Sequence, residues 1–320
     1  MTSYMHGRRA AWLGTFAAVL VGGYTLVTAG AAATTQGTDR TIYVSAVGTN
    51  GMPVVDPPLT AGELSVTEDG AAREITKVTK AEEPVYFALM FETSMCDSTD
   101  KRGSCESGNN EANATQFVQE MRGALSGFVN VVLAAAPTSK ILLMDFASAA
   151  VVKTDFSSNA KDFEPVLSRL TIQKGEPVLN EAVVDISARM AKVPSPRRVM
   201  VIVNREPTGD GSTSTQFKGV AEAAQKSGAS VWGLSVRYGT RQNGGRDQLL
   251  KGLAANSGGL RLTIGNVTQL GDYLRSVAAN TIVQYAVTIK RPADAPHANI
   301  TAVKTTRAGV QPLTLQWAAK

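Results

Sequence analysis

The sequence predicts an α/β protein with a doubly wound, mostly parallel six-stranded sheet and a small β-sandwich-like module built from both chain ends. Apolar runs without polar alternation, typical of strands covered on both faces, recur between segments with helical spacing of apolar residues. Near both ends, short segments instead alternate apolar and polar residues, as half-exposed strands do. The chain has 320 residues, 43% of them hydrophobic, which is enough for one full core plus a smaller unit.

The first alternating segments are expected strands at residues 41–47, 64–66 and 74–78. They contain too few residues to bury a core by themselves. The same alternation returns at residues 285–290, 300–305 and 313–317. We therefore expect the two ends to fold together, with the α/β domain inserted between them.

Between these ends the spacing of apolar residues changes repeatedly from the pattern of a strand to the pattern of a helix. Expected strands are 85–92, 141–146, 150–154, 199–203, 231–236 and 260–264, and expected helices are 113–135, 163–170, 179–191, 215–226, 246–256 and 266–283. The predicted organisation is a leader at 1–33, a linker at 34–40, an N-terminal β module at 41–82, the α/β domain at 83–283 and C-terminal β strands at 284–320.

The apolar strand 85–92 runs into a polar loop, at the sheet edge where open α/β sheets bind ligands. The loop begins Glu92-Thr93-Ser94-Met95-Cys96, which resembles the DxSxS motif of von Willebrand factor A (VWFA, or vWA) domains, where an aspartate and two serines hold a divalent metal ion. The segments MRGALSGFVN, RRVMVIVN, SGASVWGLSV and NTIVQYAVTIKRP resemble the bacterial exported VWFA-related family. This resemblance implies a Rossmann-like vWA fold with β segments before and after the A domain.

The metal ligands that the resemblance implies are largely replaced. Glu92 stands where the family has aspartate, and its extra methylene displaces the carboxylate by about 1.5 Å. Ser94 matches the first serine, but Cys96 replaces the second, Pro177 replaces the threonine of the second loop, and Arg205 lies where the third loop should supply an aspartate. We therefore expect a degenerate site and no cofactor.

Three possibilities for this site follow from the same residues. Arg205 could take the place of the ion and pair with Glu92 as an arginine fork, or both side chains could point into solvent. Alternatively, Mg²⁺ or Ca²⁺ could bind with altered ligands. The neighbouring acids that could join such a site are Asp97, Asp100, Glu106 and Glu111.

The N-terminal sequence predicts an exported protein. Arg8 and Arg9 precede an apolar run at 10–27, and alanines at 31–33 suit a signal peptidase. An uncleaved membrane anchor is the alternative, because the run approaches the length that spans a bilayer. We expect a periplasmic or extracellular location, where Cys96 and Cys105 would form a disulfide, with two free thiols as the alternative.

Enzymatic and nucleic-acid functions find little support in the sequence. One of the two histidines, His6, lies in the leader, and the other, His297, has no evident catalytic partners. The net charge of +5 is scattered rather than clustered, which argues against nucleic acid.

The sequence therefore predicts an exported, non-enzymatic protein-interaction or adhesion module that binds an unknown protein of the cell envelope. Its candidate contact loop contains Asp97, Asp100, Lys101, Arg102 and Glu106. A metal-dependent adhesion domain is the alternative, and sensitivity of partner binding to a chelator would distinguish the two.

Overall fold

A computed structural model describes residues 39–95, 111–206, 211–212, 217–237, 244–292 and 300–314. The predicted leader and most of the linker lie outside these residues. Within the described ranges, none of the helices has both the length and the apolar character that a membrane crossing requires.

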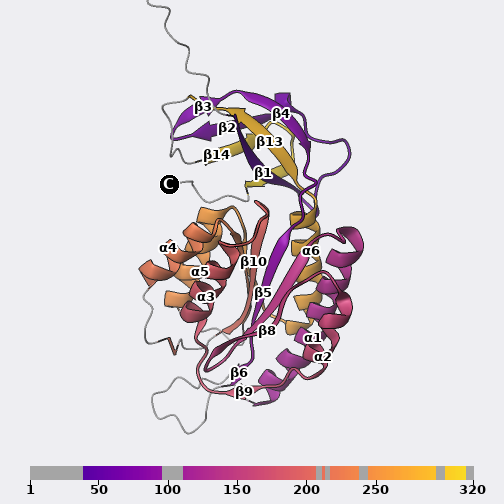
Figure 1. Ribbon diagram of the computed structural model, residues 1–320, viewed down its shortest axis with the longest axis vertical. Coiled ribbons are helices and arrows are strands. Elements are labelled where there is room, and N and C mark those ends of the chain that lie inside the picture. Colours follow the sequence, from indigo (N-terminus) through magenta and orange to yellow (C-terminus); the bar gives the residue numbers. More distant parts are fainter. Residues whose placement is uncertain are drawn as a thin grey trace, which may run out of the picture. The chain divides into compact units, whose positions relative to one another are not determined.

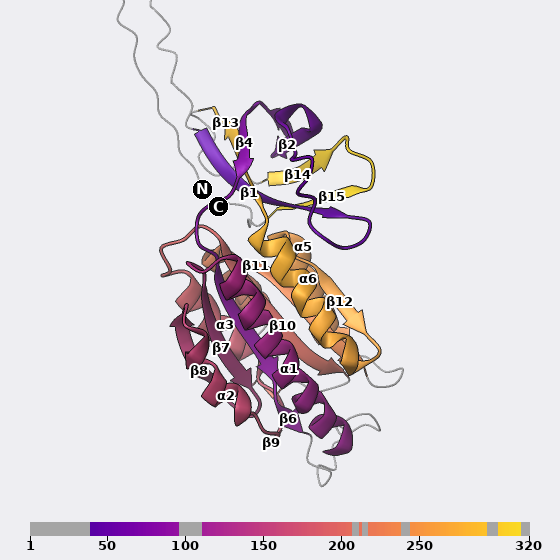
Figure 2. The ribbon, with the colours of Figure 1, turned by 90° about the vertical axis from the view of Figure 1, so that its right-hand side faces the viewer.

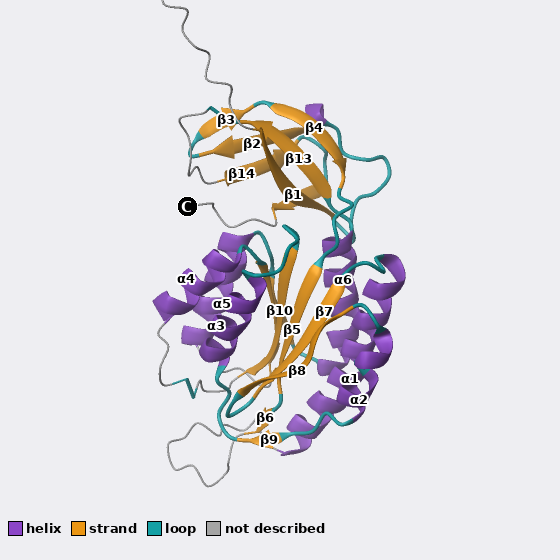
Figure 3. Ribbon diagram, viewed as in Figure 1, coloured by secondary structure: helices purple, strands orange, loops and turns teal. Residues whose placement is uncertain are grey.

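The centre of the fold is a six-stranded sheet with the order β12-β11-β10-β5-β7-β8 (Figures 1 and 3). Its neighbours pair in parallel except for the edge strand β8, which runs antiparallel to β7. The strands are β5 (Tyr86–Glu92), β7 (Lys140–Phe146), β8 (Ala150–Ser157), β10 (Arg198–Glu206), β11 (Ser230–Arg237) and β12 (Arg261–Ile264). The predicted fold class is confirmed.

Helices cover both faces of this sheet, as Figure 3 shows. Alternate residues of the fully buried strand β5 face the two layers: Phe87 and Leu89 pack with one hydrophobic cluster, and Ala88 and Met90 pack with the other. The first cluster includes side chains of α1 (Glu111–Ala135), α2 (Glu164–Ser168) and α6 (Leu270–Ile282). The second includes side chains of α3 (Leu179–Met190), α4 (Phe217–Ser227) and α5 (Gly244–Ser257).

Several element boundaries differ from those predicted. The helix expected at 266–283 begins with a 3-10 turn, η3 (Val267–Gln269), and the Asn266 side chain caps this turn by accepting a hydrogen bond from the Thr268 amide at 3.0 Å. The helix expected at 163–170 is the shorter α2, preceded by the 3-10 turn η2 (Ala160–Asp162), and the expected strand at 150–154 extends to Ser157. The pair β6 (Ser94–Met95) and β9 (Gln173–Lys174) was not predicted, because a two-residue strand has no period to detect.

Strands from both sides of the α/β region share the sheets of the β module (Figure 2). One sheet has the order β15-β1-β13-β4 and the other β14-β2-β3. The strands are β1 (Asp39–Gly48), β2 (Leu64–Glu68), β3 (Ala71–Arg73), β4 (Ile75–Lys80), β13 (Tyr285–Lys290), β14 (Ile300–Thr305) and β15 (Val310–Thr314), with a 3-10 turn η1 (Ala61–Glu63) before β2. A separate apolar cluster of Ile42, Val44, Val66 and Val287 lies within the module. The two ends therefore fold together, while the boundaries 41–82, 83–283 and 284–320 remain a proposal.

Arg197 joins the start of β10 to the β module and to the end of α6. Its guanidinium donates hydrogen bonds to Gln284 Oε1 at 2.9 Å, to the Glu83 carbonyl at 2.5 Å and to the Thr281 carbonyl at 3.0 Å. The ring of Tyr43 in β1 lies 6.0 Å from the guanidinium carbon. Burial lowers the pKa of Arg197 to about 10, and the charge of Glu83 opposes that change.

Candidate functional site

The carboxyl ends of β5 and β10 bring together charged side chains that are almost completely buried. Glu92 ends β5, Arg205 and Glu206 end β10, and Arg246 lies in the first turn of α5. Each of these four residues is at most 1% exposed. Unpaired charges at such depth would cost several kcal/mol each, so the arrangement depends on how the charges are paired.

The Glu92 carboxylate accepts hydrogen bonds from three directions. Ser94 Oγ donates to Oε1 at 2.7 Å, the Arg205 amide donates to Oε2 at 3.1 Å, and Arg246 Nη2 donates to Oε2 at 3.1 Å. Arg205 Nε lies 3.9 Å from Oε1, and Arg205 Nη2 donates to the Ser94 carbonyl. The predicted proximity of Glu92 and Arg205 is therefore present, and the alternative that both point into solvent is wrong.

The pairing differs in geometry from the bidentate fork suggested by the sequence. The shorter contact to Glu92 comes from Arg246, whereas the Arg205 guanidinium lies over the ring of Phe117 in α1, 5.5 Å from its centroid. A guanidinium group can make a cation–π contact through its planar face while its N–H groups donate hydrogen bonds along its edge. Arg205 thus links α1 to the loop after β5.

A second group of charges continues from Arg246 along α5. Glu206 accepts hydrogen bonds from Arg261 at 2.7 Å and from Arg237 at 3.2 Å, and Arg261 also lies 3.2 Å from Asp247. Burial lowers the pKa of Arg261, while Glu206 and Asp247 oppose that change. Adjacent residues of α5 therefore hold its first turn to two different sheet strands.

Asp145 forms a separate polar group at the end of β7. Its carboxylate lies 3.0 Å from Lys153 Nζ and accepts a hydrogen bond from Gln173 Nε2 at 2.7 Å. The same amide donates to Thr93 Oγ1 at 3.2 Å, and Thr93 lies between Glu92 and Ser94. Burial raises the pKa of the Asp145 carboxyl, while Lys153 and Gln173 oppose that change. Asp145 is therefore close to the Glu92 site but outside its arginine network.

The order of the strands identifies the fold. An antiparallel edge strand, β8, follows the second strand of an otherwise parallel six-stranded sheet, and the charged site lies at the end of the first strand, β5. Helices lie on both faces. The central domain is vWA-like.

Solved structures that resemble this vWA-like chain have low sequence identity to it. A von Willebrand factor type A protein from Catenulispora acidiphila has 9% identity and a TM-score of 0.46, covering 90% of this chain and 75% of its own. The manganese-loaded TRAP protein of Plasmodium vivax has 11% identity and a TM-score of 0.43, with 67% and 80% covered. A mutant of the PilB minor pilin from Streptococcus sanguinis has 9% identity and a TM-score of 0.46, with 62% and 61% covered. No family model and no curated protein matches the sequence.

The described surroundings of Glu92 in this vWA-like domain carry positive charge. Two buried guanidinium groups already lie within 4.0 Å of the Glu92 carboxylate. A dication about 4 Å from one guanidinium would be repelled by about 8 kcal/mol at an effective dielectric constant near 20. Pro177 offers only its carbonyl, which accepts a hydrogen bond from the Gly211 amide at 2.9 Å. Within the described ranges no group of three or more His, Cys, Asp or Glu side chains is placed to hold a metal.

The remaining predicted site residues lie in the segment 96–110, outside the described residues. These are Cys96, Asp97, Asp100, Lys101, Arg102, Cys105 and Glu106. The disulfide and the contact loop are therefore still predictions. Glu111 is the first residue of α1.

Sequence reasoning missed Arg246 and Asp145. Arg246 had one detectable signal: a cation in the first turn of a helix opposes the helix dipole, so it requires a compensating partner. Asp145 interrupts the otherwise apolar run of β7, and a buried carboxylate within such a run is unusual. Neither signal indicates which residue is the partner.

Proposed function

We propose that this protein is an exported, non-enzymatic protein-binding module whose vWA-like loop face works without a metal ion. The observation that carries the proposal is the Glu92 carboxylate held by Arg246 at 3.1 Å and by Arg205 at 3.9 Å, with all three residues buried. These guanidinium groups supply positive charge beside the position that the resemblance assigns to the ion.

Charge balance favours this interpretation. The side chains of three acids (Glu92, Glu206 and Asp247) and of three arginines (Arg205, Arg246 and Arg261) are each at most 7% exposed, and the more exposed Arg237 adds a further cation beside Glu206. A paired network of this kind needs no additional ion for neutrality, and removal of one member would leave a costly unpaired charge. The face is thus held in one arrangement before a partner arrives, which reduces the entropy cost of binding.

The same contacts argue against catalysis by Ser94 and Glu92. The serine hydroxyl donates to Glu92 at 2.7 Å, an arrangement that elsewhere activates a nucleophile. Here both residues are at most 1% exposed, so neither side chain is accessible to a substrate. This pair therefore serves the structure of the loop.

The partner is proposed to be a protein of the cell envelope that contacts the loop containing Asp97, Asp100, Lys101, Arg102 and Glu106. The test is site-specific photo-crosslinking in native cells, with the crosslinker at Arg102 and, as a control, at exposed Lys192, which lies between α3 and the start of β10. We expect a discrete adduct from position 102 that persists in EDTA. Adducts only from the control position, or loss of the adduct in EDTA, would overturn the proposal, and the latter would establish the metal-dependent alternative.

Direct titration provides an independent measurement. Isothermal titration of the protein with MgCl₂ and with CaCl₂ should give no binding heat in the micromolar range. Saturable micromolar binding that is lost in a Glu92→Gln variant shown by circular dichroism to be folded would show that the described site takes an ion after all.

A further inference from the structure

A cavity of about 240 Å³ lies beside the Glu92 site, between the β7–β8 edge and α2. Its lining residues are Asp145, Lys153, Pro165, Val166, Arg169, Leu170, Thr171 and Gln173. Gln173 connects the cavity to the loop face, because its side-chain amide contacts both Asp145 and Thr93. A side chain of a partner bound at the loop face could therefore reach this cavity.

The lining carries an excess of positive charge. Asp145 is neutralised by Lys153 at 3.0 Å, and Arg169, the C-cap residue of α2, adds a second cation. Arg169 is exposed and forms no ion pair with any residue in the described ranges. A carboxylate is a group that a guanidinium and an ammonium at one cavity can bind together.

The apolar part of the lining restricts the ligand further. Pro165, Val166 and Leu170 supply a hydrocarbon wall beside the two cations. A short methylene chain could pack on this wall while its terminal carboxylate meets Arg169 and Lys153. A glutamate side chain combines these two features.

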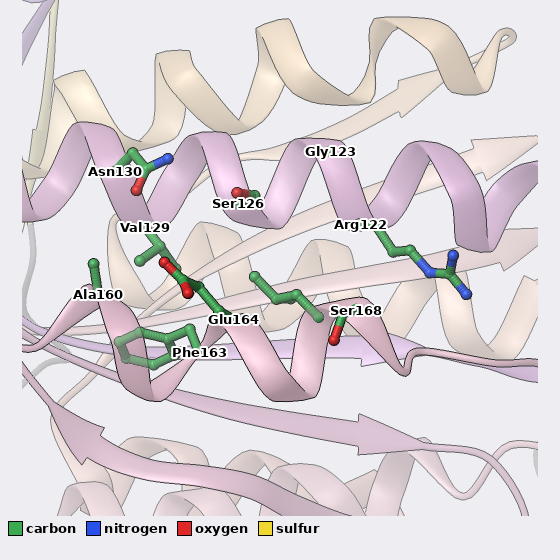
Figure 4. A pocket seen from close by; sticks show the side chains of 10 residues that line it. Arg122, Gly123, Ser126, Val129, Asn130, Ala160, Phe163, Glu164 and Ser168 are labelled. Atoms are coloured by element: carbon green, nitrogen blue, oxygen red, sulfur yellow. The ribbon is translucent and has the colours of Figure 1, made fainter.

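The larger cavity nearby does not define a ligand in this way. It has a volume of about 370 Å³ between α1 and α2, and Figure 4 shows Glu164 extending toward Asn130 while Arg122 is directed away from them. Arg122 Nε already donates to the Leu170 carbonyl at 3.1 Å, and Glu164 places a negative charge in the same lining. Its charges are therefore balanced, unlike those of the smaller cavity.

We propose that the cavity lined by Lys153 and Arg169 is a subsite for a glutamate side chain of the protein partner. The inference rests on the proposed function, because it assigns to that partner an acidic side chain next to the loop face. It differs from metal-mediated recognition in that the carboxylate is bound by side chains of this chain alone.

The test uses N-acetyl-glutamate methylamide as the probe and its uncharged isostere N-acetyl-glutamine methylamide as the control, followed by NMR of the ¹⁵N-labelled protein. We expect saturable shifts at the amides of Lys153, Arg169 and Gln173, with a dissociation constant on the order of 10 mM, and none with the glutamine probe. Arg169→Gln should weaken binding about fivefold, as expected for loss of one exposed ion pair. Lys161→Gln, an exposed position outside the lining, should leave binding unchanged.

Equal shifts with the two probes, or an Arg169→Gln variant that binds like the wild type, would overturn the subsite. Both variants replace exposed side chains, and circular dichroism would verify that they fold. Glutamate binding without a crosslink from position 102 would refute the proposed function alone. A crosslink without glutamate binding would refute the subsite alone.

Discussion

Arg246 Nη2 lies 3.1 Å from Glu92 Oε2, although 154 residues separate the two in the chain. The contact joins the first turn of α5 to the end of the central strand β5. Because both side chains are at most 1% exposed, the pair is part of the interior and not a surface ion pair. The vWA-like loop face is thus built on an internal ionic contact.

Glu92→Gln should destabilise the protein by about 3 to 5 kcal/mol, because it leaves Arg205 and Arg246 buried without their shared carboxylate. Urea unfolding followed by circular dichroism would measure the loss. Glu222→Gln, which alters an exposed i,i+4 pair of α4, is the matched control and should change stability by less than about 0.5 kcal/mol. Similar small effects of both substitutions would contradict the buried network.

Arg197→Met should cost about 3 kcal/mol of unfolding free energy, because it leaves the Glu83 and Thr281 carbonyls and the Gln284 amide oxygen without their common donor. Lys192→Met, on the exposed segment before β10, is the control and should be nearly neutral. Hydrogen exchange should show the loss of protection at β13 in the Arg197 variant. Unchanged exchange there would mean that Arg197 does not fix the junction.

Gly127→Ala should raise the unfolding free energy by about 0.5 to 1 kcal/mol, because a Cβ at this position in α1 would meet nothing within 4 Å. Gly259→Ala is the opposite case, since its Cβ would lie 2.0 Å from the Val231 carbonyl oxygen. Thermal denaturation of the two variants should therefore move in opposite directions. A destabilised Gly127→Ala protein would contradict the open space described around α1.

The contribution of the Asp145 carboxyl to the free energy of unfolding should decrease as pH rises. Burial raises its pKa in the folded state, so the folded protein retains this proton to a higher pH than the unfolded chain does. The free energy of unfolding should therefore decrease, for this group, as pH rises from its unfolded pKa of about 3.9 through the raised folded value.

Comparing wild type with Asp145→Asn isolates that contribution from those of the other acids. The stability of the variant relative to the wild type should increase with pH across this window, as measured by urea unfolding at a series of pH values. A difference that stays constant, or that changes in the opposite direction, would show that the pKa of Asp145 is not raised.

Much of the fold could be predicted from local patterns. The apolar run of β5 indicated a strand buried on both faces, and the structure places Phe87 and Ala88 in the two opposite helical layers. Alternation at both ends predicted strands that need each other, and β1 pairs with β13 and β15. These strands and helices could be predicted because apolar residues recur every two residues in a half-buried strand and about every four in a helix, and both spacings are visible in a single sequence.

The α/β class and the joining of the two chain ends could be predicted from the sequence, and the replacement of the expected metal ligands by Glu92, Pro177 and Arg205 remains a prediction. Two features became visible only in three dimensions: Arg246 is the nearer partner of Glu92, and Asp145 lines a cavity with Lys153 and Arg169. The physical reason is that charge pairing inside a protein depends on distances between segments far apart in the chain. Those distances cannot be predicted from local sequence patterns. Helices and strands can be predicted, because the spacing of their hydrophobic residues is a local property of the sequence.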